Sequence, residues 1–83
     1  MNRIVINVHP FVMKQEITVY EGNKTVEYIE HNNLDDLDKI CFNLCKKYNI
    51  HQIDFLGIKD YGLKLEERMS ANFNNYEINF TFH

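Results

Sequence analysis

The chain has 83 residues, 45% of them hydrophobic and 13% aromatic, and its formal net charge is −3. This length predicts one domain, residues 1–83, whose apolar content suits a small packed core and argues against disorder. The densest basic pair is Lys46-Lys47, so the charge pattern does not favour contact with nucleic-acid phosphates.

The first thirty residues predict a three-stranded antiparallel meander. Alternating apolar and polar residues indicate strands over residues 3–9, 13–20 and 24–30, with a Gly22-Asn23 turn before the third. The pattern assigns Val26 and Tyr28 of that third strand to the buried face and Glu27 to the opposite one. Because proline holds the preceding residue extended, His9-Pro10 is expected to end the first strand.

Two amphipathic helices are predicted in the remainder of the chain. Residues 32–49 carry apolar side chains at intervals of three and four, and Asn49 is expected to end that helix. A short strand over residues 50–57 precedes a second helix over residues 59–72, for which Asp60 is the expected cap. Residues 76–82 alternate again and form a last strand.

Cys41 and Cys45 lie on the apolar stripe of the first helix, four residues apart. In a reducing cytoplasm two buried thiols are the expected state, whereas a zinc site needs two further ligands that the spacing does not supply. We therefore expect a packing role for both cysteines, no metal and no cofactor.

This β-β-β-α-β-α-β order predicts a two-layer α/β fold. Right-handed crossovers that progress the same way across the sheet put both helices on one face. The opposite face then reads as mostly polar, with Arg3, Val5, Tyr20, Asp54 and Asn79 among its residues. A ferredoxin-like α+β sandwich is the alternative.

The order of elements resembles the minimal core of the ribonuclease H-like fold, which actin-like ATPase halves share. That resemblance implies a five-stranded mixed sheet in the order 3-2-1-4-5. It does not bring the family's chemistry with it, because the first strand offers Asn7 and His9 where the nucleases have a metal-binding aspartate. The following turn, HPFVMK, lacks the glycine of the actin-like phosphate turn. Asp54 alone would make at most a degenerate metal-dependent nuclease.

In such a sheet, ligands favour the carboxyl ends of parallel strands, so this edge is the predicted ligand site. We call this edge the rim, and its predicted ligand-binding residues are His9, Pro10, Phe11, Lys59, Asp60 and Tyr61. His31, Asn32 and His83 are expected at the same edge. Lys59 beside a helix amino terminus could hold an anion, and Tyr61 could stack on a base. Purely structural roles stay open for four of these residues. His9 could simply end a strand, Asp60 cap a helix, Lys59 be a solvated charge and Tyr61 pack in the core.

These observations favour a non-enzymatic binding module. It is expected to form a homo-oligomer through the open sheet face or the last strand, and to sequester a small anionic ligand such as a nucleotide signal. A protein that blocks or recruits another protein is the alternative, and a degenerate nuclease is the second one. Compact phage anti-defence proteins are similar in size and style.

The residue usage, rich in Asn, Ile, Lys and Tyr with a single alanine, suggests a low-GC bacterium or its phage. No apolar run approaches the roughly 20 residues of a membrane span, and the amino terminus does not resemble a signal peptide. A cytoplasmic location, in a bacterium or a phage-infected host, is therefore expected, with no membrane partner.

Overall fold

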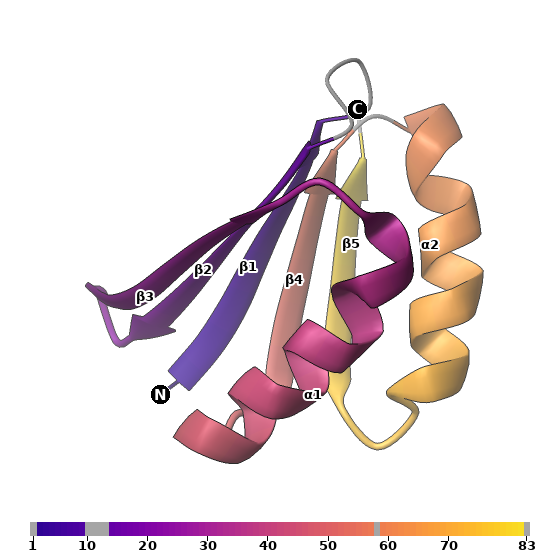
Figure 1. Cartoon of the computed structure of the whole chain (residues 1–83). Helices are drawn as coiled ribbons and strands as arrows, with labels where there is room; N and C mark the ends of the chain where they lie inside the picture. The colour runs from indigo at the N-terminus through magenta and orange to yellow at the C-terminus, as the bar shows by residue number, and fades with distance from the viewer. Residues whose placement is uncertain (1, 10–13, 58, 83) are drawn as a thin grey trace.

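The computed structural model describes residues 2–9, 14–57 and 59–82, without the side chains of residues 9, 34, 59–65 and 82. Its elements are β1 (Asn2–His9), β2 (Lys14–Glu21), β3 (Lys24–His31), the short 3-10 helix η2 (Leu34–Asp36), α1 (Leu37–Tyr48), β4 (Gln52–Gly57), α2 (Lys59–Asn72) and β5 (Glu77–Phe82). The sheet has the order β3-β2-β1-β4-β5, which confirms the predicted five-stranded arrangement (Figure 1).

Pairing directions in the sheet follow from the connections. The two hairpin-linked pairs, β1 with β2 and β2 with β3, are antiparallel. Helical crossovers make β1 with β4 and β4 with β5 parallel. The carboxyl ends of β1, β3, β4 and β5 therefore lie at the same edge of the sheet, which is the rim (Figure 1).

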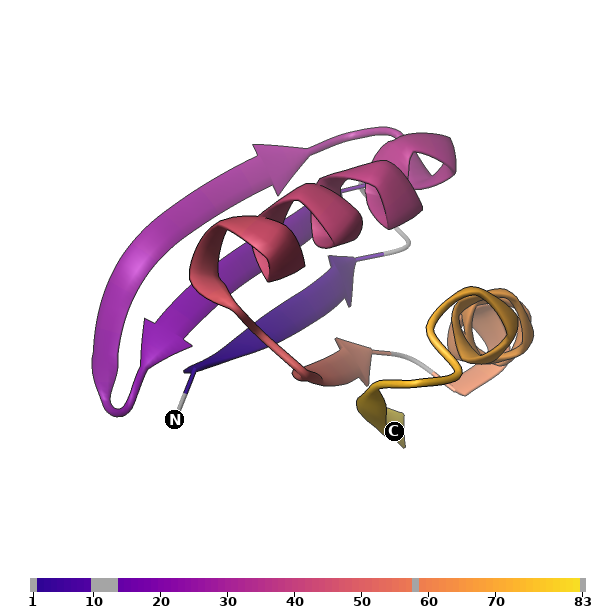
Figure 2. The same ribbon diagram turned by 90° about the horizontal axis from the view of Figure 1, so that it is seen from below.

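Helices α1 and α2 lie on one face of the twisted sheet, and no helix of the described residues lies over the other face (Figure 2). Strand β2 illustrates the consequence, because its alternate residues Ile17 and Val19 are fully buried while Thr18 between them is half-buried. The helix-covered face supplies the core, and we call the uncovered face the open face. None of the described helices is long and apolar enough to cross a membrane.

The core lies between the helices and the covered face. Its buried side chains are Ile4, Ile6, Val8, Ile17, Val19, Leu37, Cys41, Leu44, Cys45, Ile50, Ile53, Phe55, Met69 and Phe73. The sequence pattern missed Phe73, which follows α2 and stacks on Phe42 of α1 with ring centroids 4.2 Å apart. This aromatic pair ties the two helices together at the end of the molecule opposite the rim.

One face assignment made from the sequence was wrong. A register shift between Val19 and Tyr20 of β2 reverses the alternation of β3. Tyr28 consequently pairs with Thr18 and lies on the open face, 47% exposed. Glu27 instead lies on the covered side, where it accepts hydrogen bonds from Lys47 Nζ at 2.8 Å and Tyr48 Oη at 2.6 Å. Strict alternation cannot reveal such a bulge.

The carboxyl end of α1 matches the prediction, whereas the amino ends of α1 and α2 differ from it. Asn49 ends α1 in the left-handed conformation (φ 53°), as expected, and its amide donates to the Cys45 carbonyl. At the start of α1, residues 34–36 form the separate η2 turn, so the α-helix begins later than predicted. Helix α2 begins at Lys59, which places Asp60 inside the first turn instead of at the cap.

Candidate functional site

The predicted rim is described at the level of the backbone only. Asn7 of β1 pairs with Leu56 of β4, so the end of β1 lies beside the segment that leads into α2. The backbone ends of β1 and β4 and the start of α2, on which the prediction depends, thus meet at one edge (Figure 1). Pro10, Phe11 and His83 lie outside the described residues, as do the side chains of His9, Lys59, Asp60 and Tyr61. The side-chain contacts of this site therefore remain predictions.

Near the rim, a buried amide lacks a described partner. Gln15 of β2 is 0% exposed and lies between Val8 and His31 in the register. Neither its Oε1 nor its Nε2 has a hydrogen-bond partner among the described residues. His31 and Asn32 lie at this edge as predicted, and His31 Nε2 lies 3.3 Å from Asp36 Oδ2. An unpaired buried amide costs about 1–3 kcal/mol, so it is a feature that requires a reason.

The open face is described in more detail, and the register fixes its rows. Val5 of the central strand β1 lies between Thr18 of β2 and Asp54 of β4. One row nearer the start of β1, Arg3 pairs with Tyr20. One row toward the rim, Asn7 lies between Glu16 and Leu56.

A shallow hollow of about 500 Å³ lies on this face. Its lining residues are Arg3, Val5, Tyr20, Gln52, Asp54, Leu56, Asn79 and Thr81. The Arg3 guanidinium lies 5.0 Å from the centre of the Tyr20 ring, a cation–π distance. Asn79 Nδ2 donates to Asp54 Oδ1 at 2.9 Å, which orients that carboxylate. The hollow therefore combines apolar side chains with one cation and one acid.

Beside the hollow, a tyrosine joins two carboxylates on the open face. Tyr28 Oη lies 2.5 Å from Glu16 Oε2 and 2.9 Å from Glu30 Oε1, and Lys14 Nζ lies 3.2 Å from Glu30 Oε1. Hydrogen bonding to Glu16 is the largest influence that raises the pKa of the Tyr28 phenol. The Tyr28 hydroxyl and the Lys14 ammonium lower the pKa of Glu30. This cluster keeps the part of the open face over β2 and β3 acidic.

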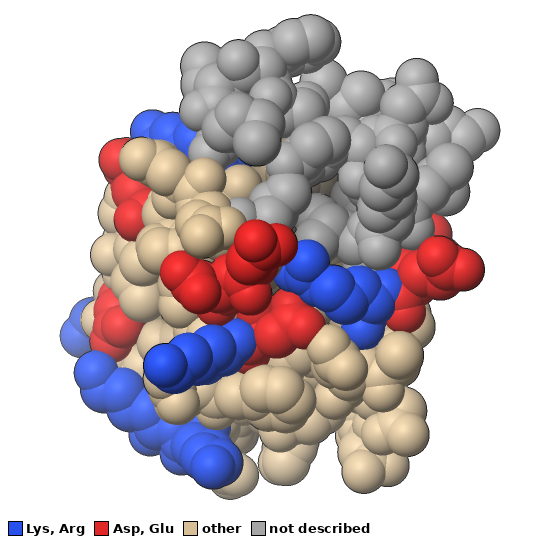
Figure 3. Space-filling view, turned by 45° about the vertical axis from the view of Figure 1, so that its right-hand side comes forward, with Lys and Arg blue, Asp and Glu red and all other residues tan. Residues whose placement is uncertain are grey.

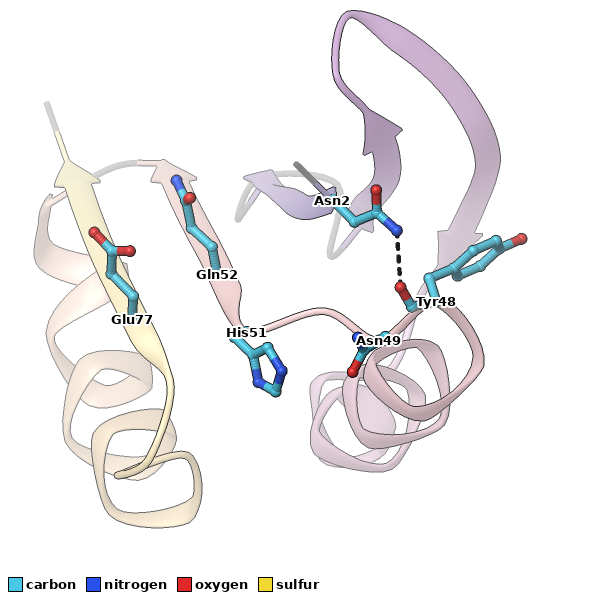
Figure 4. Close-up of a pocket in the computed structure, with 6 residues that line it drawn as sticks. All are labelled: Asn2, Tyr48, Asn49, His51, Gln52 and Glu77. Carbon is cyan, nitrogen blue, oxygen red and sulfur yellow. Dashed lines mark hydrogen bonds between the residues drawn. The ribbon is translucent and has the colours of Figure 1, made fainter.

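A second hollow, of about 490 Å³, lies at the edge of the sheet opposite the rim (Figure 4). Asn2, Tyr48, Asn49, His51, Gln52 and Glu77 line it. Asn2 Nδ2 donates to the Tyr48 carbonyl at 2.8 Å, which fixes the end of α1 to the start of β1. His51 and Glu77 are exposed and supply one base and one acid. The hydrogen bond from Asn2 is used to hold two elements of the fold together. We therefore regard this hollow as a structural contact between elements and not as a ligand site.

The described residues offer neither a reactive cysteine nor a group of metal ligands. Cys41 and Cys45 are 0% and 3% exposed, as predicted. Burial raises the pKa of both thiols, to about 11 for Cys45, so neither is a ready nucleophile. Among the described residues, no group of three His, Cys, Asp or Glu side chains could hold a metal ion.

The helical side of the molecule carries acidic and basic side chains close together (Figure 3). Asp38 of α1 accepts hydrogen bonds from Arg68 Nε at 3.1 Å and from the side chain of Asn72, both on α2. Lys47 and Glu27 form another pair at 2.8 Å. These pairs lie within the chain and fasten α1 to its neighbours, so this side does not present a field of one sign.

Comparison with known proteins does not assign this chain to a family. No model of a known protein family matches this chain, and no curated protein matches its sequence. The functional argument therefore depends on the residues themselves. Alternation in the sequence had already placed Arg3, Tyr20 and Asp54 on the open face, but it did not identify them as parts of one hollow. Only the strand register reveals that.

Proposed function

We propose that this chain is a non-enzymatic binding module that works as a homo-oligomer and assembles through its open face. The observation that carries the proposal is the hollow on that face, where half-buried Val5, Tyr20 and Leu56 lie among side chains of both charges. A small domain buries a modest fraction of its surface, so assembly adds stability that the single chain lacks. Apolar side chains within a mixed-charge surround are typical of protein interfaces.

A charged substitution at the centre of the open face tests this proposal. We expect light scattering after gel filtration to give the unaltered chain a mass above the 10.0 kDa of one copy. Val5→Lys, which places an ammonium at the centre, should lower that mass to one copy while the circular dichroism spectrum is unchanged. Ser70→Lys, at an exposed position of α2, is the matched control and should keep the oligomer. An oligomer that survives Val5→Lys would remove the open face from the proposal.

We further propose that the rim, which such an assembly leaves free, takes a small anionic ligand such as a nucleotide. The support is the amino end of α2 at the rim, because backbone amides at a helix start favour anions and Lys59 would add a positive charge. The open face is a poorer candidate, since it carries the carboxylates of Asp54, Glu16 and Glu30.

Thermal melting with a panel of nucleoside mono-, di- and triphosphates and cyclic dinucleotides tests the ligand. One member should raise the melting temperature, and Lys59→Ala should abolish the rise while Lys24→Ala, in the exposed hairpin, leaves it intact. A panel without any rise would leave the protein-binding alternative as the better reading. Magnesium-dependent cleavage of nucleic acid, lost in Asp54→Asn, would instead favour the nuclease.

A further inference from the structure

We infer that two copies of this chain pack open face to open face, with their strands crossing at nearly a right angle and Val5 on the two-fold axis. The inference rests on the proposed function, whose oligomer it specifies. Orthogonal packing is one of the two common ways in which sheets stack. The argument for it comes from where the register places the charges around Val5.

The open face is a grid whose spacings in its two directions differ by about 2 Å, so a step along a strand of one copy falls close to a step across the strands of the other. Neighbouring strands lie about 4.8 Å apart, and side chains on one face repeat about every 6.7 Å along a strand. From Val5, Asp54 is one step across the grid on β4, and Arg3 is one step back along β1. Thr18 is one step across in the other direction, on β2, and Asn7 one step forward on β1.

Four two-fold axes can pass through Val5 in the plane of the interface: along the strands, across them, and along the two diagonals. The axis along the strands puts Arg3 over Arg3 of the other copy, and the axis across them puts Asp54 over Asp54 of the other copy. Repulsion between like charges disfavours both of these packings. One diagonal puts Arg3 over Thr18 and leaves both charges without an ionic partner. The other diagonal puts Arg3 over the second copy's Asp54, twice by symmetry.

The same diagonal axis also matches the apolar side chains. It places Tyr20 over the second copy's Leu56, at the hollow, so that each ring enters the depression on the other copy. Thr18 comes to lie over the second copy's Asn7, two side chains that can share hydrogen bonds. Glu16 comes to lie near its own symmetry mate, which is the one unfavourable pair in this arrangement.

Arg3 supplies the cation for this pair. Its side chain is half-buried on the open face, with the guanidinium 5.0 Å from the centre of the Tyr20 ring. A carboxylate is the acceptor that fits the terminal nitrogens of a guanidinium best. Asp54 of the second copy can be that acceptor, because its contact with Asn79 uses only Oδ1.

Charge reversal tests the pairing directly, with sedimentation velocity over a range of concentrations as the readout. Arg3→Glu and Asp54→Arg should each raise the dimer dissociation constant about tenfold or more, since each creates two like-charge pairs in the symmetric dimer. The double variant should return to within about threefold of the original value. Lys46→Glu and Glu67→Arg, at exposed helix positions, are the matched controls and should leave the dimer unchanged.

The near-isosteric variants Arg3→Gln and Asp54→Asn remove the charge with little change in shape, so they are less able to disturb the fold than the charge reversals. Each should also weaken the dimer. Glu16→Gln should strengthen it, because it relieves the one unfavourable pair. A dimer that is equally stable in all of these variants would overturn this packing while leaving the proposed oligomer standing. A double variant that stays as weak as the single ones would overturn the contact between Arg3 and Asp54. A monomer at every concentration would instead contradict the proposed function itself.

Discussion

At the scale of single residues, burial makes the two cysteine thiols of the chain less reactive. Cys41 and Cys45 have raised pKa values because burial disfavours their thiolates. Their position on the apolar stripe made this predictable from the sequence. The Gln15 amide, which has no hydrogen-bond partner among the described residues, was not predictable. Alternation indicates which face a residue takes but not whether a hydrogen-bond partner lies within reach.

Both thiols should be unreactive in the folded chain. We expect a thiol reagent such as dithionitrobenzoate to modify neither cysteine at neutral pH over the time in which an exposed cysteine reacts fully, because the thiolate is the reactive form. In about 6 M guanidinium, which should unfold a small domain, both should react. Lys24→Cys supplies an exposed thiol as an internal control. Rapid modification of two thiols in the unaltered folded chain would contradict the described burial.

The Gln15 amide should lower the stability of the fold. Gln15→Met keeps the length of the side chain and removes both atoms that lack a partner among the described residues, so we expect the free energy of unfolding to rise by about 1–2 kcal/mol in urea titrations. Ser70→Met, at an exposed position of α2, is the control for added apolar surface. If Gln15→Met destabilises the chain, the amide has a partner in the native state.

At the scale of elements, strand order and helix placement could be predicted because the hydrophobic periods are long and the connections few. The faces of β3 could not be predicted in full, since one bulge exchanged Glu27 and Tyr28. The role of Phe73 was missed for a different reason. It lies just beyond α2, where helical periodicity no longer applies, and only its contact with Phe42 explains its burial.

Phe73 should be essential for joining α2 to α1. Phe73→Ala removes a fully buried ring and should cost about 3–5 kcal/mol, a large share of the stability of a small domain. Phe42→Ala removes the other ring of the stack, which is 38% exposed, and should cost clearly less. Phe73→Leu provides a milder variant if the alanine variant does not fold. Equal losses for the two alanine variants in urea unfolding would argue against this packing.

The contact between β3 and α1 should make stability depend on pH. Hydrogen bonds from Lys47 and Tyr48 hold the pKa of Glu27 below its ordinary value of 4.5. A lowered pKa contributes stability above pH 4.5, and that contribution is lost as the pH falls toward the folded-state value. Melting temperatures between pH 3 and 7 should therefore converge for the unaltered chain and Glu27→Gln at low pH. A constant difference across that range would contradict the assignment.

At the scale of the whole molecule, the fold separates two surfaces. The open face is described in side-chain detail and offers a hollow of mixed character, whereas the rim is defined by where strands end and α2 begins. The sequence predicted the location of the rim through topology, but it could not predict the hollow. That hollow depends on which residues of four strands stand in adjacent rows, and register is set by tertiary pairing.

The central claim, that the open face joins two copies, is tested most directly by sedimentation equilibrium of the unaltered chain beside Val5→Lys. We predict that the unaltered chain has twice the 10.0 kDa chain mass at high concentration and dissociates toward one copy on dilution, whereas Val5→Lys has the mass of one copy throughout. A mass of one copy at every concentration up to about 1 mM, where even an association of about 4 kcal/mol would be visible, would contradict the account.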